Sequence, residues 1–235
     1  MKTQWIKGLV ALLVLLFGLG ADDTGCRSEA SSDVNQQRIY TSYWLLYDGQ
    51  TDITYARAQF RLGSSTGTTL VLQDPARVEF EGTPMGFNEV VDWHEAQLAG
   101  EVASGEFRYT DTDGSTFVNR VALSSTAEAA SDLATTIPTT AAFELAWEGP
   151  PLGENETMVA FVARVDNRFN FGRFEQRSRG ATSLVIGANG LRSVGPGAAV
   201  LSFRRHRDLS IGETPMAGGH GLTTYQSREV AVTLR

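Results

Sequence analysis

The stretch Ala56-Arg57-Ala58-Gln59-Phe60-Arg61-Leu62 alternates apolar residues with arginine and glutamine. Successive side chains of a β-strand point to opposite faces of its sheet. This spacing therefore puts the alanines, the phenylalanine and the leucine on one face and the polar residues on the other. The stretch predicts a half-buried antiparallel strand whose one face lies against a hydrophobic core.

The same period of two recurs along the chain from Arg38 onward. Turn-forming sequences lie between the alternating segments of the first half of the chain, for example "YDGQTD" (47–52) and "DTDG" (111–114). Short alternating strands divided by turns favour a sandwich over a βαβ arrangement. Further segments with this period are 69–72, 77–81, 106–110, 143–148, 199–204 and 229–234.

A stretch of small and polar residues, 124–138, contains no aromatic side chain and predicts a linker. The expected fold class is therefore all-β, with two tandem antiparallel β-sandwich domains at 38–123 and 139–235. This strand pattern resembles exported bacterial proteins with tandem immunoglobulin-like sandwiches. The paired cysteines and the tryptophan of antibody-type domains are absent, so the resemblance implies a fold and no activity.

The N-terminus has the pattern of an export signal. Lys2 and Lys7 precede the apolar run Leu9–Leu19, which is too short to span a bilayer comfortably. These features predict a signal peptide over residues 1–25. Cleavage after Gly20 or Ala21 would release a periplasmic or secreted protein.

Cys26, the single cysteine, follows this signal. The apolar run and the cysteine resemble a bacterial lipoprotein signal, in which a lipid-modified cysteine becomes the new N-terminus. Thr24 and Gly25 fit the small residues of that pattern, whereas Asp23 departs from it. The resemblance implies a lipid anchor on Cys26 and a place in the bacterial cell envelope. The polar residues that follow predict a flexible tether over 26–37.

Charge is unevenly distributed along the chain. Residues 26–138 contain 7 arginines and 16 acidic residues, whereas residues 139–235 contain 11 arginines and 9 acidic residues. The second half is thus predicted to carry a basic face that binds anions. Its predicted members are Arg168, Arg173, Arg177, Arg179, Arg204, Arg205 and Arg207.

Two partners fit such a face: an acidic envelope component, such as a glycan or a lipopolysaccharide phosphate, or the acidic first domain of the same chain. A solvated sheet face or a charge-protected edge strand would explain the arginines equally well. Phe169, Phe171 and Phe174 are expected to pack in the core or at an edge, and Gly172 is expected to form a bulge. No nucleic-acid partner is expected, because the chain has a net charge of −7.

Signals for catalysis are sparse. The chain lacks G-x-S-x-G, H-E-x-x-H and a phosphate-binding glycine loop. His94, His206 and His220 are each interpreted as structural or surface residues. No catalytic residue, metal site or cofactor is predicted.

These observations favour a non-catalytic envelope lipoprotein that binds or bridges another surface component. The alternative is a carbohydrate-active or other hydrolase module built on the carboxylates of Glu89, Asp92 and Glu95. Glycoside hydrolysis requires two carboxyl groups about 5–10 Å apart.

Overall fold

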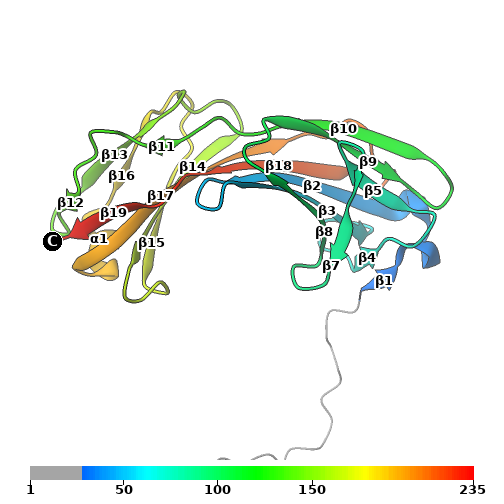
Figure 1. Ribbon diagram of the computed structural model, residues 1–235, viewed down its shortest axis with the longest axis horizontal. Helices are drawn as coiled ribbons and strands as arrows, with labels where there is room; N and C mark the ends of the chain where they lie inside the picture. The colour runs from blue at the N-terminus through cyan, green and yellow to red at the C-terminus, as the bar shows by residue number, and fades with distance from the viewer. Residues whose placement is uncertain (1–27) are drawn as a thin grey trace, which may run out of the picture.

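The computed structural model describes residues 28–235 and confirms an all-β fold (Figure 1). Its only α-helix in this range is the short α1, and no helix in residues 28–235 is long and apolar enough to cross a membrane. The elements are β1 (Glu29–Ala30), β2 (Ile39–Asp48), β3 (Ile53–Leu62), β4 (Thr69–Val71), β5 (Arg77–Phe80), β6 (Thr83–Pro84), β7 (Gly86–Asn88), β8 (Trp93–Ala99), β9 (Ser104–Thr110), β10 (Thr116–Ala122), β11 (Glu128–Ala129), β12 (Thr136–Ile137), β13 (Phe143–Glu148), β14 (Glu156–Arg164), β15 (Phe171–Gln176), β16 (Ser183–Ile186), α1 (Ala188–Val194), β17 (Gly197–Leu209), β18 (Gly219–Gln226) and β19 (Val230–Leu234).

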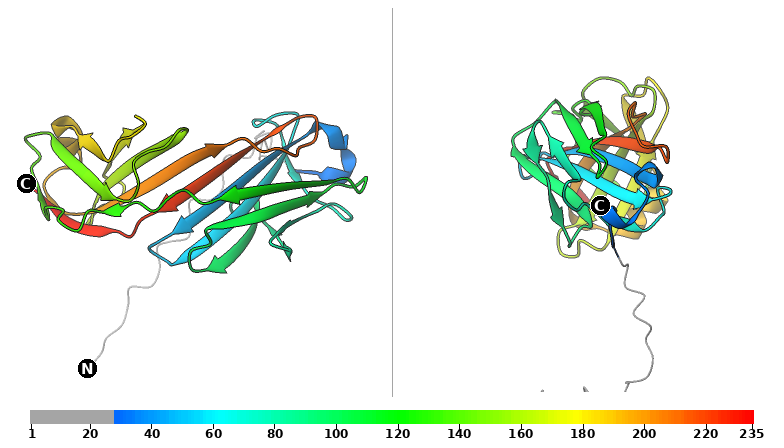
Figure 2. Two further views of the ribbon diagram at one scale, coloured as in Figure 1. Left: turned by 90° about the horizontal axis from the view of Figure 1, so that it is seen from above. Right: turned by 90° about the vertical axis from the view of Figure 1, so that its right-hand side faces the viewer.

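The largest sheet forms an arch, with the path β1-β4-β3-β2-β18-β17-β14-β15 (Figures 1 and 2). Two smaller sheets, β10-β9-β5-β6 and β11-β13-β16, cover the convex side of the arch at its two ends. Tyr43 stacks on Phe107 in one sandwich, and Phe203 contacts Trp147 in the other. Both hydrophobic cores therefore lie on the convex side of one continuous sheet.

This continuity corrects the predicted separation of two domains. β18 belongs to the predicted second domain, yet it pairs in parallel with β2 of the first, from Gly219↔Thr41 to Gln226↔Asp48. The predicted linker is also part of the fold, because β11 pairs with β13 and β12 with β19. Residues 124–138 thus contribute one strand to a small sheet and one to the main sheet. A period of two identifies strands but does not say which of them pair.

The predicted tether is wrong for its described part, residues 28–37. β1 pairs in parallel with β4, and the side chains of Ser31 and Gln36 are buried. Gln36 Nε2 donates to the carbonyl of Ser31 at 2.8 Å, which satisfies a buried amide. Polar composition misled the prediction, because these polar groups bond to backbone inside the fold. The signal peptide and Cys26 lie outside the described residues.

Arg205 is also placed differently from the prediction. Its side chain is only 1% exposed and forms an ion pair with Glu156, whose side chain is buried as well. The guanidinium donates to the carbonyls of Pro150 and Pro151 at 2.7 and 2.8 Å, and Glu156 Oε2 accepts from the amide of Gly153 at 2.7 Å. The ion pair therefore fastens the 150–153 loop to β14 and β17.

We predict that Arg205→Ala lowers the free energy of unfolding by about 3–5 kcal/mol, because it leaves the Glu156 carboxylate buried without its cation. The double variant Arg205→Met with Glu156→Leu should recover much of this loss. Urea denaturation of the three proteins measures the difference. A cost below about 1 kcal/mol for Arg205→Ala would contradict the role assigned to the pair.

Candidate binding face

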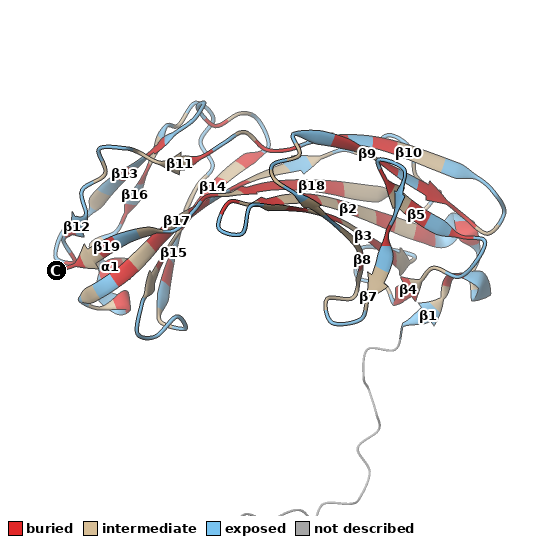
Figure 3. Ribbon diagram, in the orientation of Figure 1, coloured by how far each residue is buried: buried red, intermediate tan, exposed pale blue. Residues whose placement is uncertain are grey.

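The open side of the arch presents one face of the main sheet, here called the concave face (Figure 1). Along β2, the odd-numbered residues from Ile39 to Tyr47 are buried and the even-numbered residues are half-buried. This alternation appears in Figure 3 as successive bands along the strand. The concave face is therefore lined by the even-numbered side chains of β2 and by their neighbours on β3, β8, β17, β18 and β14.

An aromatic cluster occupies one part of this face. Register places Trp44 of β2 beside Arg57 of β3, and Arg57 beside Glu95 of β8. The rings of Trp44 and Trp93 lie 5.9 Å apart and are tilted by 58°. The Arg57 guanidinium lies 5.5 Å from the Trp44 ring centre and 5.0 Å from that of Tyr55. The cluster thus combines three aromatic rings with one cation.

Arg57 is held in this position by a carboxylate. Its Nε donates to Glu95 Oε2 at 2.6 Å, and Gln97 Nε2 donates to Glu95 Oε1 at 2.8 Å. Both side chains of the ion pair are largely shielded from solvent, at 19% exposure for Arg57 and 7% for Glu95. Shielding strengthens such a charge-assisted bond, so the cluster is preorganised.

A polar network continues across the strands from this cluster. Trp44 Nε1 donates to Thr224 Oγ1 at 3.0 Å, and His206 Nδ1 lies 2.8 Å from the same oxygen. Burial lowers the pKa of His206, and the nearby charges of Arg204 and Arg173 lower it further. His206 is therefore held toward its neutral form, which suits a hydrogen-bonding group on a binding surface.

The next row of the face contains Asp48, Gln226 and Arg204. Arg204 Nε donates to Gln226 Oε1 at 2.7 Å, and Gln226 Nε2 donates to Asp48 Oδ1 at 3.1 Å. The guanidinium of Arg204 also lies 4.9 Å from the centre of the Phe161 ring. A second aromatic–arginine contact thus repeats the arrangement around Arg57 on the other half of the arch.

The seven predicted anion-binding arginines do not form one face. Arg204 and Arg173 lie on the concave face, whereas Arg205 is buried on the opposite side of β17 and Arg207 donates to the carbonyl of Ala122. Neighbours in a strand point to opposite sides, so a run of arginines is divided between the two faces.

Arg173 lies within β15, whereas Arg168, Arg177 and Arg179 lie beyond its two ends. Arg173 and Arg177 both pair with Glu175, and Arg168 pairs with Glu229 at 2.7 Å. Arg179 lies in the exposed segment after β15. Two carboxylates, Glu175 and Glu229, are thus the direct partners of three of these four arginines.

The prediction that the phenylalanines of this segment pack in the core or at an edge is confirmed for Phe174 and wrong for Phe169. Phe169 is 95% exposed and Phe171 is 53% exposed, while Phe174 is half-buried against the core. Gly172 forms no bulge, because it pairs regularly with Val162. A Cβ at Gly172 would lie 2.7 Å from the Phe174 ring and 3.1 Å from Val194 of α1, so the glycine makes room for these two side chains.

Two of the three carboxylates of the hydrolase alternative have separate partners, and the third is exposed. Asp92 Oδ2 accepts from Thr69 Oγ1 at 2.8 Å, Glu95 binds Arg57, and Glu89 is exposed in the β7–β8 turn. Within residues 28–235 no group of three His, Cys, Asp or Glu side chains is arranged to hold a metal ion. The geometry therefore offers no observation in favour of hydrolysis.

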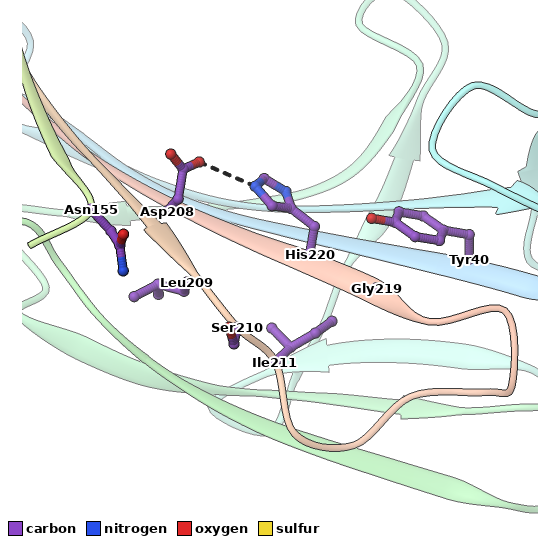
Figure 4. A pocket seen from close by; sticks show the side chains of 8 residues that line it. All are labelled: Tyr40, Asn155, Asp208, Leu209, Ser210, Ile211, Gly219 and His220. Atoms are coloured by element: carbon purple, nitrogen blue, oxygen red, sulfur yellow. Dashed lines mark hydrogen bonds and ion pairs between the residues drawn. The ribbon is translucent and has the colours of Figure 1, made fainter.

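An open pocket of about 420 Å³ adjoins the concave face (Figure 4). His220 Nε2 lies 3.3 Å from Asp208 Oδ1 across β17 and β18. Figure 4 shows this pair and the Tyr40 ring along one side of the pocket, with Ile211 facing them. The pocket lining is Tyr40, Asn155, Asp208, Leu209, Ser210, Ile211, Gly219 and His220.

Comparison with known proteins identifies no family. No protein-family model matches the chain, and no curated protein matches it. Among solved structures, a surface glycan-binding protein, SGBP-B of the Bacteroides ovatus mixed-linkage glucan utilization locus, solved with a mixed-linkage heptasaccharide, is similar over 88% of this chain. The match spans 65% of that protein's chain, less than two thirds, with 10% identity and a TM-score of 0.25. A score this low does not establish a shared fold.

The buried histidines predict a pH dependence of stability. Burial lowers the pKa of His94, which packs between Phe60 and Phe87, and burial also lowers that of His206. As the pH falls, these histidines therefore take up protons in the unfolded chain before they do so in the folded protein. The contribution of the neutral histidines to the free energy of unfolding is thus fully present above about pH 6.5 and is lost as the pH falls through their folded-state pKa values.

Urea midpoints between pH 7.5 and 5 measure this loss. His94→Gln should reduce the pH dependence, because a glutamine takes up no proton, and the exposed His220→Gln serves as the matched control. An unchanged slope in His94→Gln would contradict the assignment.

Proposed function

We propose that this protein is a non-catalytic binding protein of the bacterial cell envelope, anchored through a lipid on Cys26. Its ligand is a saccharide component of the envelope, and its binding surface is the concave face. The observation that carries the proposal is the cluster of Trp44, Trp93 and Tyr55 around the Arg57–Glu95 ion pair.

The chemistry of this cluster matches that of a sugar ring. A pyranose has faces of C–H groups and a rim of hydroxyl groups. Half-exposed aromatic rings offer rigid apolar contact to such faces at little entropic cost. Arg57, Glu95 and Gln97 place planar donors and acceptors next to the rings, where hydroxyl groups of a bound sugar would lie.

Two arginines of the concave face suit an acidic saccharide. Arg61 donates to Gln59 Oε1 at 2.8 Å and to the carbonyl of Gly67 at 3.0 Å, and Arg204 donates to Gln226. Within residues 28–235, neither arginine forms a direct ion pair with a carboxylate. Their guanidinium groups therefore suit a uronate or phosphate group carried by the glycan.

We predict that the protein binds an acidic polysaccharide more tightly than a neutral glucan. Trp44→Ala and Arg57→Ala should each weaken this binding by about tenfold or more, since each removes a central aromatic or cationic contact. Calorimetric titration with a polyuronate and with a neutral β-glucan measures both effects.

Arg77→Ala is the matched control for Arg57→Ala. Arg77 also pairs with a carboxylate, that of Glu79, but lies on β5 in the other layer of the sandwich. This variant should bind like the wild type. Equal losses in Arg57→Ala and Arg77→Ala, or full binding by Trp44→Ala, would rule out the concave face as the binding surface.

The anchor is tested separately. We predict that a metabolically supplied fatty acid labels the wild-type chain and not Cys26→Ser, and that the variant leaves the membrane fraction. The absence of label from the wild type, or label retained by the variant, would contradict anchoring through Cys26.

A further inference from the structure

Two turns project from the arch toward the same side. The β7–β8 turn lies at one end and the β14–β15 turn at the other, and both point away from the small sheets (Figure 1). β1, where the described chain begins, lies low on that side as well. The two turns and the start of the fold therefore share one direction.

Both turns present large apolar side chains to solvent. Val90 in the β7–β8 turn is 93% exposed, and Phe169 in the β14–β15 turn is 95% exposed. Val165 and Phe171, which flank the second turn, are each 53% exposed. The β14–β15 turn thus gathers three exposed apolar side chains, and such a group is typical of a contact with a partner or a lipid surface. Val90 adds a single apolar side chain at the other turn.

Hydrogen bonds hold the β14–β15 turn in shape. The amide of Asn170 donates to the carbonyl of Asn167 at 2.9 Å, and Asn170 Nδ2 donates to the carbonyl of Val194 at 2.8 Å. Arg164 binds Asp166 at 2.7 Å. The turn is thus braced against the end of α1, and Phe169 is presented by an ordered support.

The β7–β8 turn is braced in a similar way. The amide of Asp92 donates to the carbonyl of Asn88 at 2.8 Å, and the carbonyl of Asp92 accepts from Gln59 Nε2 at 3.0 Å. Thr69 Oγ1 donates to the Asp92 carboxylate. Val90 therefore stands at the tip of a turn that β3 and β4 hold in place.

The length of chain between Cys26 and the fold limits the position of a membrane. Glu29 is already paired in β1, and only three residue steps separate it from Cys26. Three steps of extended chain span at most about 11 Å. A lipid on Cys26 would thus hold the β1 side of the arch next to the bilayer surface.

We propose that Phe169, Phe171, Val165 and Val90 form a membrane seat, which rests on the lipid-bearing surface together with the Cys26 anchor. This inference depends on the lipid anchor of the proposed function. The seat supplies a second attachment beside the lipid, and phenylalanine is among the apolar residues found at the bilayer interface. It directs the concave face toward the membrane surface, so the ligand is an acidic saccharide within reach of the lipid headgroups.

The proposed contact between the seat and the membrane is made by apolar side chains. Asp166 balances Arg164, and Glu229 balances Arg168, so the β14–β15 turn has paired charges beside its phenylalanines. The seat should therefore hold at high salt, unlike a polybasic attachment.

The experiment uses the lipidated full-length protein in vesicles of phosphatidylethanolamine and phosphatidylglycerol. An environment-sensitive fluorophore is attached to the single free thiol of Phe169→Cys or Val90→Cys, since the lipid occupies the thiol of Cys26. Val185→Cys is the matched control, because Val185 is an apolar β16 residue, 65% exposed, on the convex side.

We expect fluorescence at positions 169 and 90 to rise several-fold on membranes, at low and high salt, with quenching by a lipid-borne quencher. The label at position 185 should not change. Labels at 169 and 185 that respond alike, or a response at 169 that salt abolishes, would overturn the seat.

Mass analysis of the N-terminal peptide separates the two proposals. An acylated Cys26 with solvent-exposed labels at 169 and 90 overturns the seat and leaves the anchor standing. A Cys26 without lipid overturns both the anchor and the seat that depends on it.

Discussion

The parallel pairing of β2 with β18 is the interaction on which the rest of the structure depends. It joins strands about 180 residues apart in sequence into one sheet, so each small sheet covers one end of the same arch. It also completes the concave face, because Thr224 of β18 accepts the indole hydrogen of Trp44 and contacts His206 of β17. β2 and β18 are neighbours in the middle of the path of the main sheet, so this pairing lies at the centre of the molecule.

Polar residues on the two faces of this sheet have different roles. Arg204 and Arg205 are neighbours, yet one meets Gln226 and Phe161 on the concave face and the other is buried against Glu156. The first is available to a ligand, while the second fixes a loop. The proposed binding surface and a structural ion pair thus arise from adjacent residues because their side chains leave the strand in opposite directions.

Much of the fold could be predicted from local pattern, but the candidate face could not. The strand at 56–62 and the all-β class are confirmed, because period-two alternation directly reflects one buried face. Trp44 and Trp93 escaped prediction although alternation along 39–48 places Trp44 opposite the buried residues. Their meeting depends on the β2–β3–β8 register, which no local pattern contains. The tether at 28–37 and the bulge at Gly172 were wrong, because composition does not reveal which partners satisfy buried polar groups or fill the space beside a glycine.

Half-buried strands could be predicted from the order of residues alone, since alternation is a property of neighbouring residues. The pattern at Cys26 that resembles a lipoprotein signal is likewise local. In contrast, the folded structure was needed to show which strands share a sheet, which arginines are buried, and which aromatic residues meet at the concave face. The physical reason is that pairing, register and burial depend on contacts between residues far apart along the chain, and these contacts exist only in the folded protein.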